Sequence, residues 1–356
     1  MRAVMKIKKG ALAVVIAFLG VVVLLFSDGV RQGVLNGLAL CGNSVIPSLF
    51  LFTALSVFAV KSGVLEVFDR CTPISKRVFG LSGSELAVFF VSLVSGYPVG
   101  VTLINETYQK GKITERRAQK LSSFCVGAGP AFIISVVGGA VLGSADDGRR
   151  IFIATVFSSV VLAVLSRFVE KDKKPSNLPE NQKEKAPKIS LSDTFVLSVS
   201  SASATMLNVS AFVVAFSGIL GMLKDFKLPL AVQKYGLSLL EVTSGVANFG
   251  RGELCAVAFI VGFGGVSVHL QLLAAGKGFG LTYKRVLLSR ILHGALSGVT
   301  VFAFDKICPR ATETVAIVGQ ARAGIHGNPL SAAAMLLLAV SVVTFTYKGI
   351  KKFKPD

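Results

Sequence analysis

Residues 253–273 read ELCAVAFIVGFGGVSVHLQLL, an apolar run that is interrupted by glycines at Gly262–Gly265. Residues 85–108 read ELAVFFVSLVSGYPVGVTLINETY, and glycine and proline interrupt this run in the same way at Ser95–Gly100. Each run is long enough to cross a bilayer. Non-helical backbone at membrane depth leaves N–H and C=O groups unpaired, so it persists only inside protein or beside a wet cavity. The two runs therefore predict a polytopic helical membrane protein with a site at its two breaks.

The composition of the whole chain favours the same class of protein. Of its 356 residues 52% are hydrophobic and 16% are charged, and the mean hydropathy is +0.69. Soluble domains carry about 25% charged residues, so lipid is the expected solvent for this chain. The net charge of +19 comes mainly from residues between the apolar runs, as in cytoplasmic loops. This pattern disfavours a secreted disulfide scaffold, a disordered chain and a soluble DNA-binding protein, and we expect no nucleic-acid partner.

A polar linker divides the chain into two halves. Residues 169–193 are rich in Lys, Glu, Pro and Asn, which is typical of a solvated segment. The sequence thus predicts an N-terminal transmembrane half at residues 1–168, which starts with an extra helix, and a C-terminal half at residues 194–356. The predicted helical segments are residues 11–27, 45–60, 115–142 with a break at 127–130, 151–168, 205–223 and 330–347, with a short interfacial helix at 30–43.

The halves resemble each other at a constant shift in sequence. At the shift that brings Glu85 onto Glu253, Gly96 falls on Gly264 without any gap, and Arg117 falls on Arg285 further along. Few residues are identical, so chance similarity of composition is the alternative explanation. A glycine-broken apolar segment at the same place in two halves is the sequence pattern typical of a transporter binding site.

The basic turn at Lys110–Lys120 bears on how the first broken segment lies in the membrane. If residues 85–108 crossed once, this turn would lie outside the cell, whereas a re-entrant hairpin that turns at Gly96–Pro98 keeps it inside. Each arm of that hairpin is too short to span the bilayer alone. We therefore expect a re-entrant hairpin in the first half. In the second half the basic residues and an inverted repeat conflict, and the orientation stays open.

Ionisable and polar residues inside apolar segments are the candidates for function in a membrane. Glu241 is expected in the middle of a helix, where the alternative role is a structural hydrogen bond. His269 and Gln271 follow the second break and would line the same cavity. Arg290 could hold an anionic substrate, and contact with a lipid headgroup is the alternative. The expected substrate-binding residues are Gly96, Tyr97, Pro98, Gly129, Pro130, Glu241, Gly264, Gly265, Ser267, His269, Gln271 and Arg290.

Sequence signatures of catalysis are missing from the chain. It has no HExxH, GxSxG or Walker motif, and its His and Cys residues have no metal-ligand spacing. The five cysteines are scattered and form no CxxC pair, so we expect them to be reduced and structural. We therefore expect no enzyme, no cofactor and no metal site.

Five segments together resemble one family, the YlbJ-type sporulation integral membrane proteins. These segments are Ser44–Phe50, Ser95–Gly100, Cys125–Phe132, Leu240–Gly245 and Gly262–Gln271. The likeness extends from about Asn43 to His293. It implies membership of the nucleoside-recognition (Gate) domain group, with two repeated all-α halves and re-entrant hairpins similar to those of concentrative nucleoside transporters.

The resemblance also implies a function. In spore formers it implies transport of dipicolinic acid from the mother cell to the forespore, across the outer forespore membrane. The alternatives are a carrier of nucleosides or other small solutes with the same architecture, and a membrane scaffold that transports nothing. The expected partners are a small anionic substrate and a bilayer with anionic headgroups, and self-assembly into a homo-oligomer stays open. The expected location is the bacterial cell membrane, with several passes.

Overall fold

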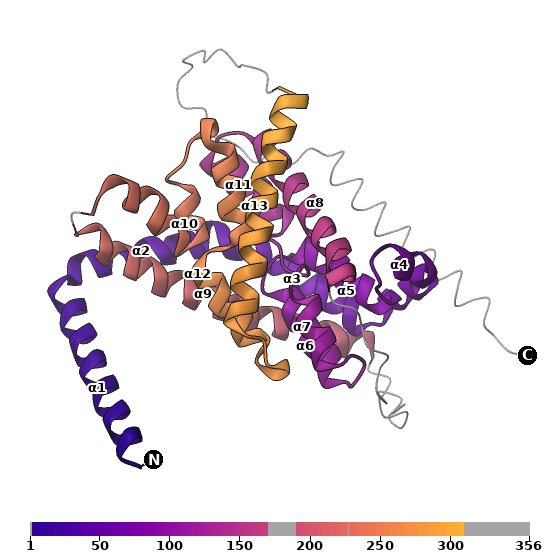
Figure 1. Cartoon of the computed structure of the whole chain (residues 1–356), viewed down its shortest axis with the longest axis horizontal. Helices are drawn as coiled ribbons and strands as arrows, with labels where there is room; N and C mark the ends of the chain where they lie inside the picture. Colours follow the sequence, from indigo (N-terminus) through magenta and orange to yellow (C-terminus); the bar gives the residue numbers. More distant parts are fainter. Residues whose placement is uncertain (1, 170–189, 227, 310–356) are drawn as a thin grey trace, which may run out of the picture. The chain divides into compact units, whose positions relative to one another are not determined.

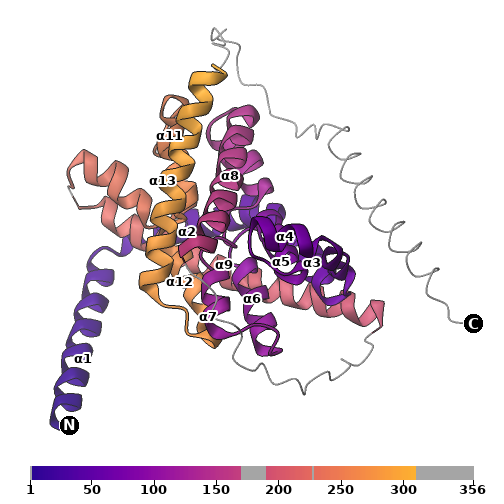
Figure 2. The ribbon, with the colours of Figure 1, turned by 45° about the vertical axis from the view of Figure 1, so that its right-hand side comes forward.

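The computed structural model describes residues 2–169, 190–226 and 228–309 (Figures 1 and 2). By its internal contacts the chain separates into one unit, Met1–Ile307, and a second unit, Cys308–Asp356. Every element discussed below belongs to the first unit. Within the described ranges all regular elements are helical, which confirms the all-α fold class. The predicted span at 330–347 and most of the predicted linker lie outside these ranges.

Five segments of the described chain are long and apolar enough to cross a membrane, which confirms the prediction of several passes. They are Ser27–Lys61, Ala145–Phe168, Leu191–Lys224, Arg251–Ala275 and Tyr283–Ile307. Large apolar side chains stay exposed along them, for example Leu51, Leu207 and Val299. So much exposed apolar surface along helices of this length indicates that lipid covers them.

The N-terminal helices run on further than the sequence predicts. Helix α1 (Arg2–Leu25) is followed by α2 (Ser27–Leu40), which continues through a π-helical turn at Cys41–Val45 into α3 (Ile46–Lys61). The prediction of a separate short interfacial helix at residues 30–43 is therefore wrong. The polar residues Asn43 and Ser44 lie in the π-helical turn, which shifts the helix register but does not end the helix.

Glycines allow α2 to pack directly against the backbone of α9 (Leu191–Lys224). A Cβ atom on Gly33 would lie 2.2 Å from the carbonyl oxygen of Ser217, and one on Gly221 would lie 2.1 Å from the carbonyl oxygen of Gly29. Small residues bring membrane helices this close because lipid gives no hydrophobic force between them and van der Waals contact must supply the attraction.

The first predicted break, at Gly96, separates two short helices, and a further short helix lies on either side of this pair. The elements here are α4 (Thr72–Val78), α5 (Gly83–Ser95), α6 (Val99–Gln109) and α7 (Glu115–Leu121). A capping box of Ser82 and Glu85 starts α5, and Thr114 caps α7. The guanidinium of Arg117 on α7 donates to the carboxylate of Glu85 at 2.5 Å, which ties the two helix starts together.

The helix predicted over residues 115–142 is shorter than expected. After α7 the chain runs without a helix to Pro130, and a π-helix then covers Ala131–Val141. The next elements are α8 (Ala145–Val169), α9, a short α10 (Val242–Val246), α11 (Leu254–Phe263), α12 (Gly265–Ala275) and α13 (Tyr283–Ile307). Helix α13 packs beside α11 and α8 (Figure 2). The second predicted break thus falls at Gly264, between α11 and α12.

Candidate binding cavity

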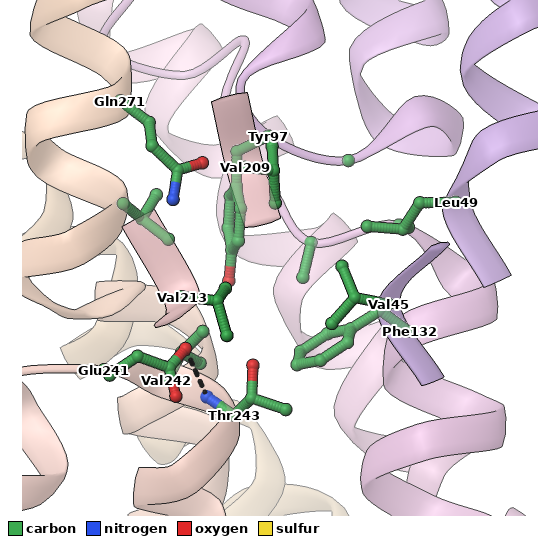
Figure 3. Close-up of a pocket in the computed structure, with 14 residues that line it drawn as sticks. Val45, Leu49, Tyr97, Phe132, Val209, Val213, Glu241, Val242, Thr243 and Gln271 are labelled. Carbon is green, nitrogen blue, oxygen red and sulfur yellow. Dashed lines mark hydrogen bonds between the residues drawn. The ribbon is translucent and has the colours of Figure 1, made fainter. Parts of the chain in front are cut away.

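Three interruptions of the helices meet at one small cavity (Figure 3). They are the turn between α5 and α6, the loop before the π-helix, and the segment that leads into α10. The lining residues are Val45, Leu49, Gly96, Tyr97, Ala128, Gly129, Phe132, Val209, Val213, Glu241, Val242, Thr243, Val268 and Gln271. Figure 3 shows the polar side chains of Tyr97, Glu241, Thr243 and Gln271 directed into the same space. The cavity is about 30 Å³ in volume, which is room for about two water molecules.

Glu241 does not lie in the middle of a helix, so that prediction is wrong. Its backbone is extended, with φ −142° and ψ 124°, and its side chain caps α10. The carboxylate accepts the backbone N–H of Thr243 at 3.0 Å and that of Ser244 at 2.7 Å. Glu241 is 1% exposed, and no Lys or Arg in the described ranges makes an ion pair with it. A buried carboxylate is thus held by two amides at the end of a short helix.

The first break contacts the backbone of the loop before the π-helix. Gly96 has a φ of 79°, which favours glycine, and a Cβ atom there would lie 3.0 Å from the amide nitrogen of Gly129. The hydroxyl of Tyr97 donates to the carbonyl of Val261 on α11 at 3.2 Å. Gly96, Tyr97 and Gly129 line the cavity. Pro98 and Pro130, which precede α6 and the π-helix, are not among its lining residues.

The second break lies against the segment that carries Glu241. Gly264 and Gly265 have φ values of 85° and 76°. A Cβ atom on Gly265 would lie 3.1 Å from the nitrogen of Val242, and the N–H of Ser267 donates to the carbonyl of Leu240 at 2.9 Å. The start of α12 therefore fixes the position of the extended backbone at Glu241.

Gln271 and Ser267 form a buried polar pair on α12. The side-chain amide of Gln271 donates to the Ser267 hydroxyl at 3.4 Å. The amide oxygen of Gln271 has no hydrogen-bond partner among the described residues. Gln271 lines the cavity, whereas Ser267 is fully buried and is not among the lining residues. The free amide oxygen is available to a donor that enters the cavity.

His269 and Arg290 are buried but do not line the cavity. The Nε2 of His269 lies 3.0 Å from the carbonyl oxygen of Phe263. The guanidinium of Arg290 donates to the carbonyls of Val126 at 2.6 Å and Ser123 at 3.0 Å. Arg290 therefore holds the loop whose next residues line the cavity. Its direct contact with an anion stays a prediction.

Some residues of the cavity carried no signal in the sequence. Thr243 is one polar residue among many in the sequence. It lines the cavity because the extended backbone at Glu241 starts α10 at this point. Val209 and Val213 come from α9, far along the chain, and an apolar residue in a span is not distinguished from its neighbours. The described cysteines form no disulfides with one another, and the described residues contain no group of three or more metal-ligating side chains.

A larger polar cleft adjoins the cavity at Thr243, which lines both. The cleft is about 810 Å³ in volume and lies between α2, α9 and residues 230–248. Its polar side chains include Gln32, Asn36, Lys224 and Lys234. The ammonium of Lys234 donates to the carboxylate of Glu253 at 2.7 Å, and this hydrogen bond raises the pKa of Lys234. The lysine therefore stays charged at neutral pH.

Comparison with known proteins supports the resemblance seen in the motifs. No family model matches the chain, and no solved structure matches it. The chain is 24% identical to the sporulation integral membrane protein YlbJ of Bacillus subtilis (strain 168), over 76% of this chain and 76% of that protein. The chain is a multi-pass integral membrane protein, and its resemblance to the YlbJ-type sporulation membrane proteins is confirmed.

Proposed function

We propose that the chain carries a small organic anion through the membrane by way of the cavity at Glu241, and that dipicolinic acid is this anion. The transport would run from the mother cell to the forespore across the outer forespore membrane. The observation that carries the proposal is the meeting of three helix interruptions and a buried carboxylate at one cavity beside a polar cleft. Interrupted helices at a central site are typical of secondary transporters.

The site holds two amide donors of the kind that a carboxylate ligand needs, and Glu241, the charged residue of the lining, occupies them. The amides of Thr243 and Ser244 already bind one carboxylate, that of Glu241. A substrate carboxylate would have to displace Glu241 from these two donors, because two carboxylates in one small cavity repel each other. The Tyr97 ring lines the same cavity and gives it an aromatic wall (Figure 3). A planar pyridine ring with two carboxylates combines the two features that the site can bind.

Transport would need a second conformation of this site. The cavity holds only about two water molecules, whereas the dipicolinate ring is much larger. The helices on either side of Gly96 and Gly264 are short, and a rearrangement at these breaks would widen the cavity. The breaks at Gly96 and Gly264 each lie between two short helices, α5 and α6 in the first half and α11 and α12 in the second. We include in the proposal the internal repeat and the re-entrant hairpins that the sequence predicts.

Flux into vesicles tests the proposed function. The full chain would be reconstituted in liposomes, and uptake of labelled dipicolinate would be measured with and without H⁺ and Na⁺ gradients. We expect uptake above that of protein-free vesicles, and we expect unlabelled dipicolinate to compete better than a nucleoside. Better competition by the nucleoside would show that the site belongs to a carrier of nucleosides, which is the alternative substrate class. Absence of flux for both solutes would favour the membrane scaffold.

A further inference from the structure

The Glu241 cavity contains a negative charge without a counter-charge. Among the lining residues Glu241 is the one with a charged side chain, and it makes no ion pair with a Lys, Arg or His of the described ranges. Its carboxylate accepts hydrogen bonds from the backbone amides of Thr243 and Ser244, which are neutral dipoles. Burial of an unbalanced charge is costly, so the cavity favours a ligand that brings a positive charge.

The side chains that face the cavity offer oxygen atoms to such a ligand. Figure 3 shows the Tyr97 hydroxyl, the Glu241 carboxylate and the Thr243 hydroxyl directed into the same space. The Tyr97 hydroxyl donates its proton to the carbonyl of Val261, so its oxygen is free to act as a ligand. Carboxylate and other oxygen ligands select hard cations, whereas softer metals prefer nitrogen and sulfur.

The amide oxygen of Gln271 is a second and independent sign of a ligand in this cavity. Gln271 is 2% exposed and lines the cavity, and its Oε1 has no hydrogen-bond partner among the described residues. The amide nitrogen of the same side chain already donates to the Ser267 hydroxyl. A buried acceptor without a partner is unfavourable, so this oxygen fits an ion or a water molecule that enters the cavity.

The volume and the charge of the cavity select a small monovalent ion. The space of about 30 Å³ holds about two water molecules, so an ion enters with about one water. Mg²⁺ usually keeps several waters, and Ca²⁺ takes about six to eight oxygen ligands, which this space cannot hold. A divalent ion would also exceed the charge of the single carboxylate.

We propose that the Glu241 cavity binds one Na⁺ ion. The ion lies against the Glu241 carboxylate with the hydroxyls of Thr243 and Tyr97 as further ligands, and its remaining water donates to the amide oxygen of Gln271. The carboxylate keeps its two bonds from the backbone, because each oxygen has two lone pairs. Apolar side chains such as that of Val213 lower the local dielectric constant, which strengthens the attraction between ion and carboxylate.

The ion would also prepare the site for the substrate, and this part rests on the proposed function. Without the ion, a substrate carboxylate meets the charge of Glu241 in the same cavity, and the two repel each other. With Na⁺ bound, the ion and Glu241 together have no net charge, and the substrate gains a cation as its neighbour. In the widened conformation of the cavity, anion binding would therefore require Na⁺, and both would cross the membrane together.

Binding of radiolabelled Na⁺ to the purified full chain in detergent tests the site without any substrate. Scintillation proximity would measure it, with choline as the replacing cation and K⁺ as a competitor. Glu241→Gln removes the charge, and Gln271→Leu removes the free oxygen but leaves the cap of α10 in place. Glu85→Gln is the matched control, because Glu85 is also a buried carboxylate at a helix start but already pairs with Arg117. Size-exclusion profiles identify the folded variants.

We expect saturable binding of one Na⁺ per chain, with K⁺ as a poor competitor. Glu241→Gln should weaken binding by more than about tenfold, and Gln271→Leu by about fivefold, as expected for one lost hydrogen bond. Glu85→Gln should bind like the parent. Absence of saturable binding to the folded parent would overturn the proposal. Equal binding by the parent, Glu241→Gln and Gln271→Leu would overturn it as well.

Uptake of labelled dipicolinate in sodium and in choline media tests the coupling. We expect faster uptake when Na⁺ is present outside the vesicles. Equal uptake in both media would overturn the coupling, although the proposed function would stand. Saturable Na⁺ binding that Glu241→Gln weakens, in a chain that transports no dipicolinate, would support the ion site and contradict the proposed function alone.

Discussion

At the scale of single residues, Glu241 and Arg290 have opposite relations to the cavity. Glu241 reaches it with a carboxylate that two amides hold, whereas Arg290 binds two carbonyls behind it. Both groups are almost fully buried. Burial of a charge is costly unless hydrogen bonds satisfy it, so each side chain fixes the backbone that it contacts.

Replacement of Glu241 should weaken the start of α10. Glu241→Gln keeps one oxygen acceptor and loses the other, so we expect a loss of about 1 kcal/mol in unfolding free energy, in the range of a helix cap. Glu241→Ala removes both acceptors and should cost more. Thermal unfolding in detergent measures the stability of the parent, Glu241→Gln and Glu241→Ala, which should decrease in that order. An alanine variant as stable as the parent would refute the capping role.

Replacement of Arg290 should release the loop before the π-helix. Arg290→Met preserves the length of the side chain but leaves the carbonyls of Val126 and Ser123 without their donor, which costs about 1–3 kcal/mol for each buried group. Arg116→Met, at an exposed position on α7, is the control. Melting temperatures of the two variants should differ clearly. A similar small change in both would mean that Arg290 does not hold the loop.

At the scale of elements, the close contact of α2 and α9 depends on glycine. Gly33→Ala would place a Cβ atom 2.2 Å from the Ser217 carbonyl oxygen, and backbone on both sides cannot move aside without separating the helices. Gly42→Ala, in the same continuous helix, has no atom within 4 Å of the added carbon. We expect Gly33→Ala to lower the melting temperature and Gly42→Ala to leave it unchanged or raise it. Equal melting temperatures would contradict the packing.

The sequence predicts the breaks that contain glycine or proline and misses the others. Gly96 and Gly264 interrupt apolar runs, and a residue type that favours positive φ marks both positions. No such residue marks the extended backbone at Glu241, because the contact from Ser267 to Leu240 that fixes it joins distant parts of the sequence. The partners of Arg290 are equally distant, so no local pattern could show that it contacts carbonyls.

At the scale of the whole molecule, Thr243 lines both the Glu241 cavity and the cleft formed by α2, α9 and residues 230–248. We expect a solute to reach the cavity through this cleft. The route predicts a pattern of accessibility. In a chain whose cysteines are replaced by alanine, Ser244→Cys in the cleft should react with a charged methanethiosulfonate reagent. Ser267→Cys, at a fully buried position that lines neither the cleft nor the cavity, should stay unlabelled. Mass spectrometry measures the labelling, and reaction of both cysteines at the same rate would argue against the separation of cleft and interior.

The central claim is that the helix breaks at the Glu241 cavity move an anion. It is tested most directly by the initial rate of labelled dipicolinate uptake into vesicles that contain Gly264→Val. Gly111→Val is the matched control, because Gly111 also has a positive φ, of 65°, but lies in an open turn away from the cavity. With equal amounts of folded protein in the vesicles, we expect uptake by Gly264→Val to fall to background and uptake by Gly111→Val to match the parent. Equal uptake by all three chains would contradict the account.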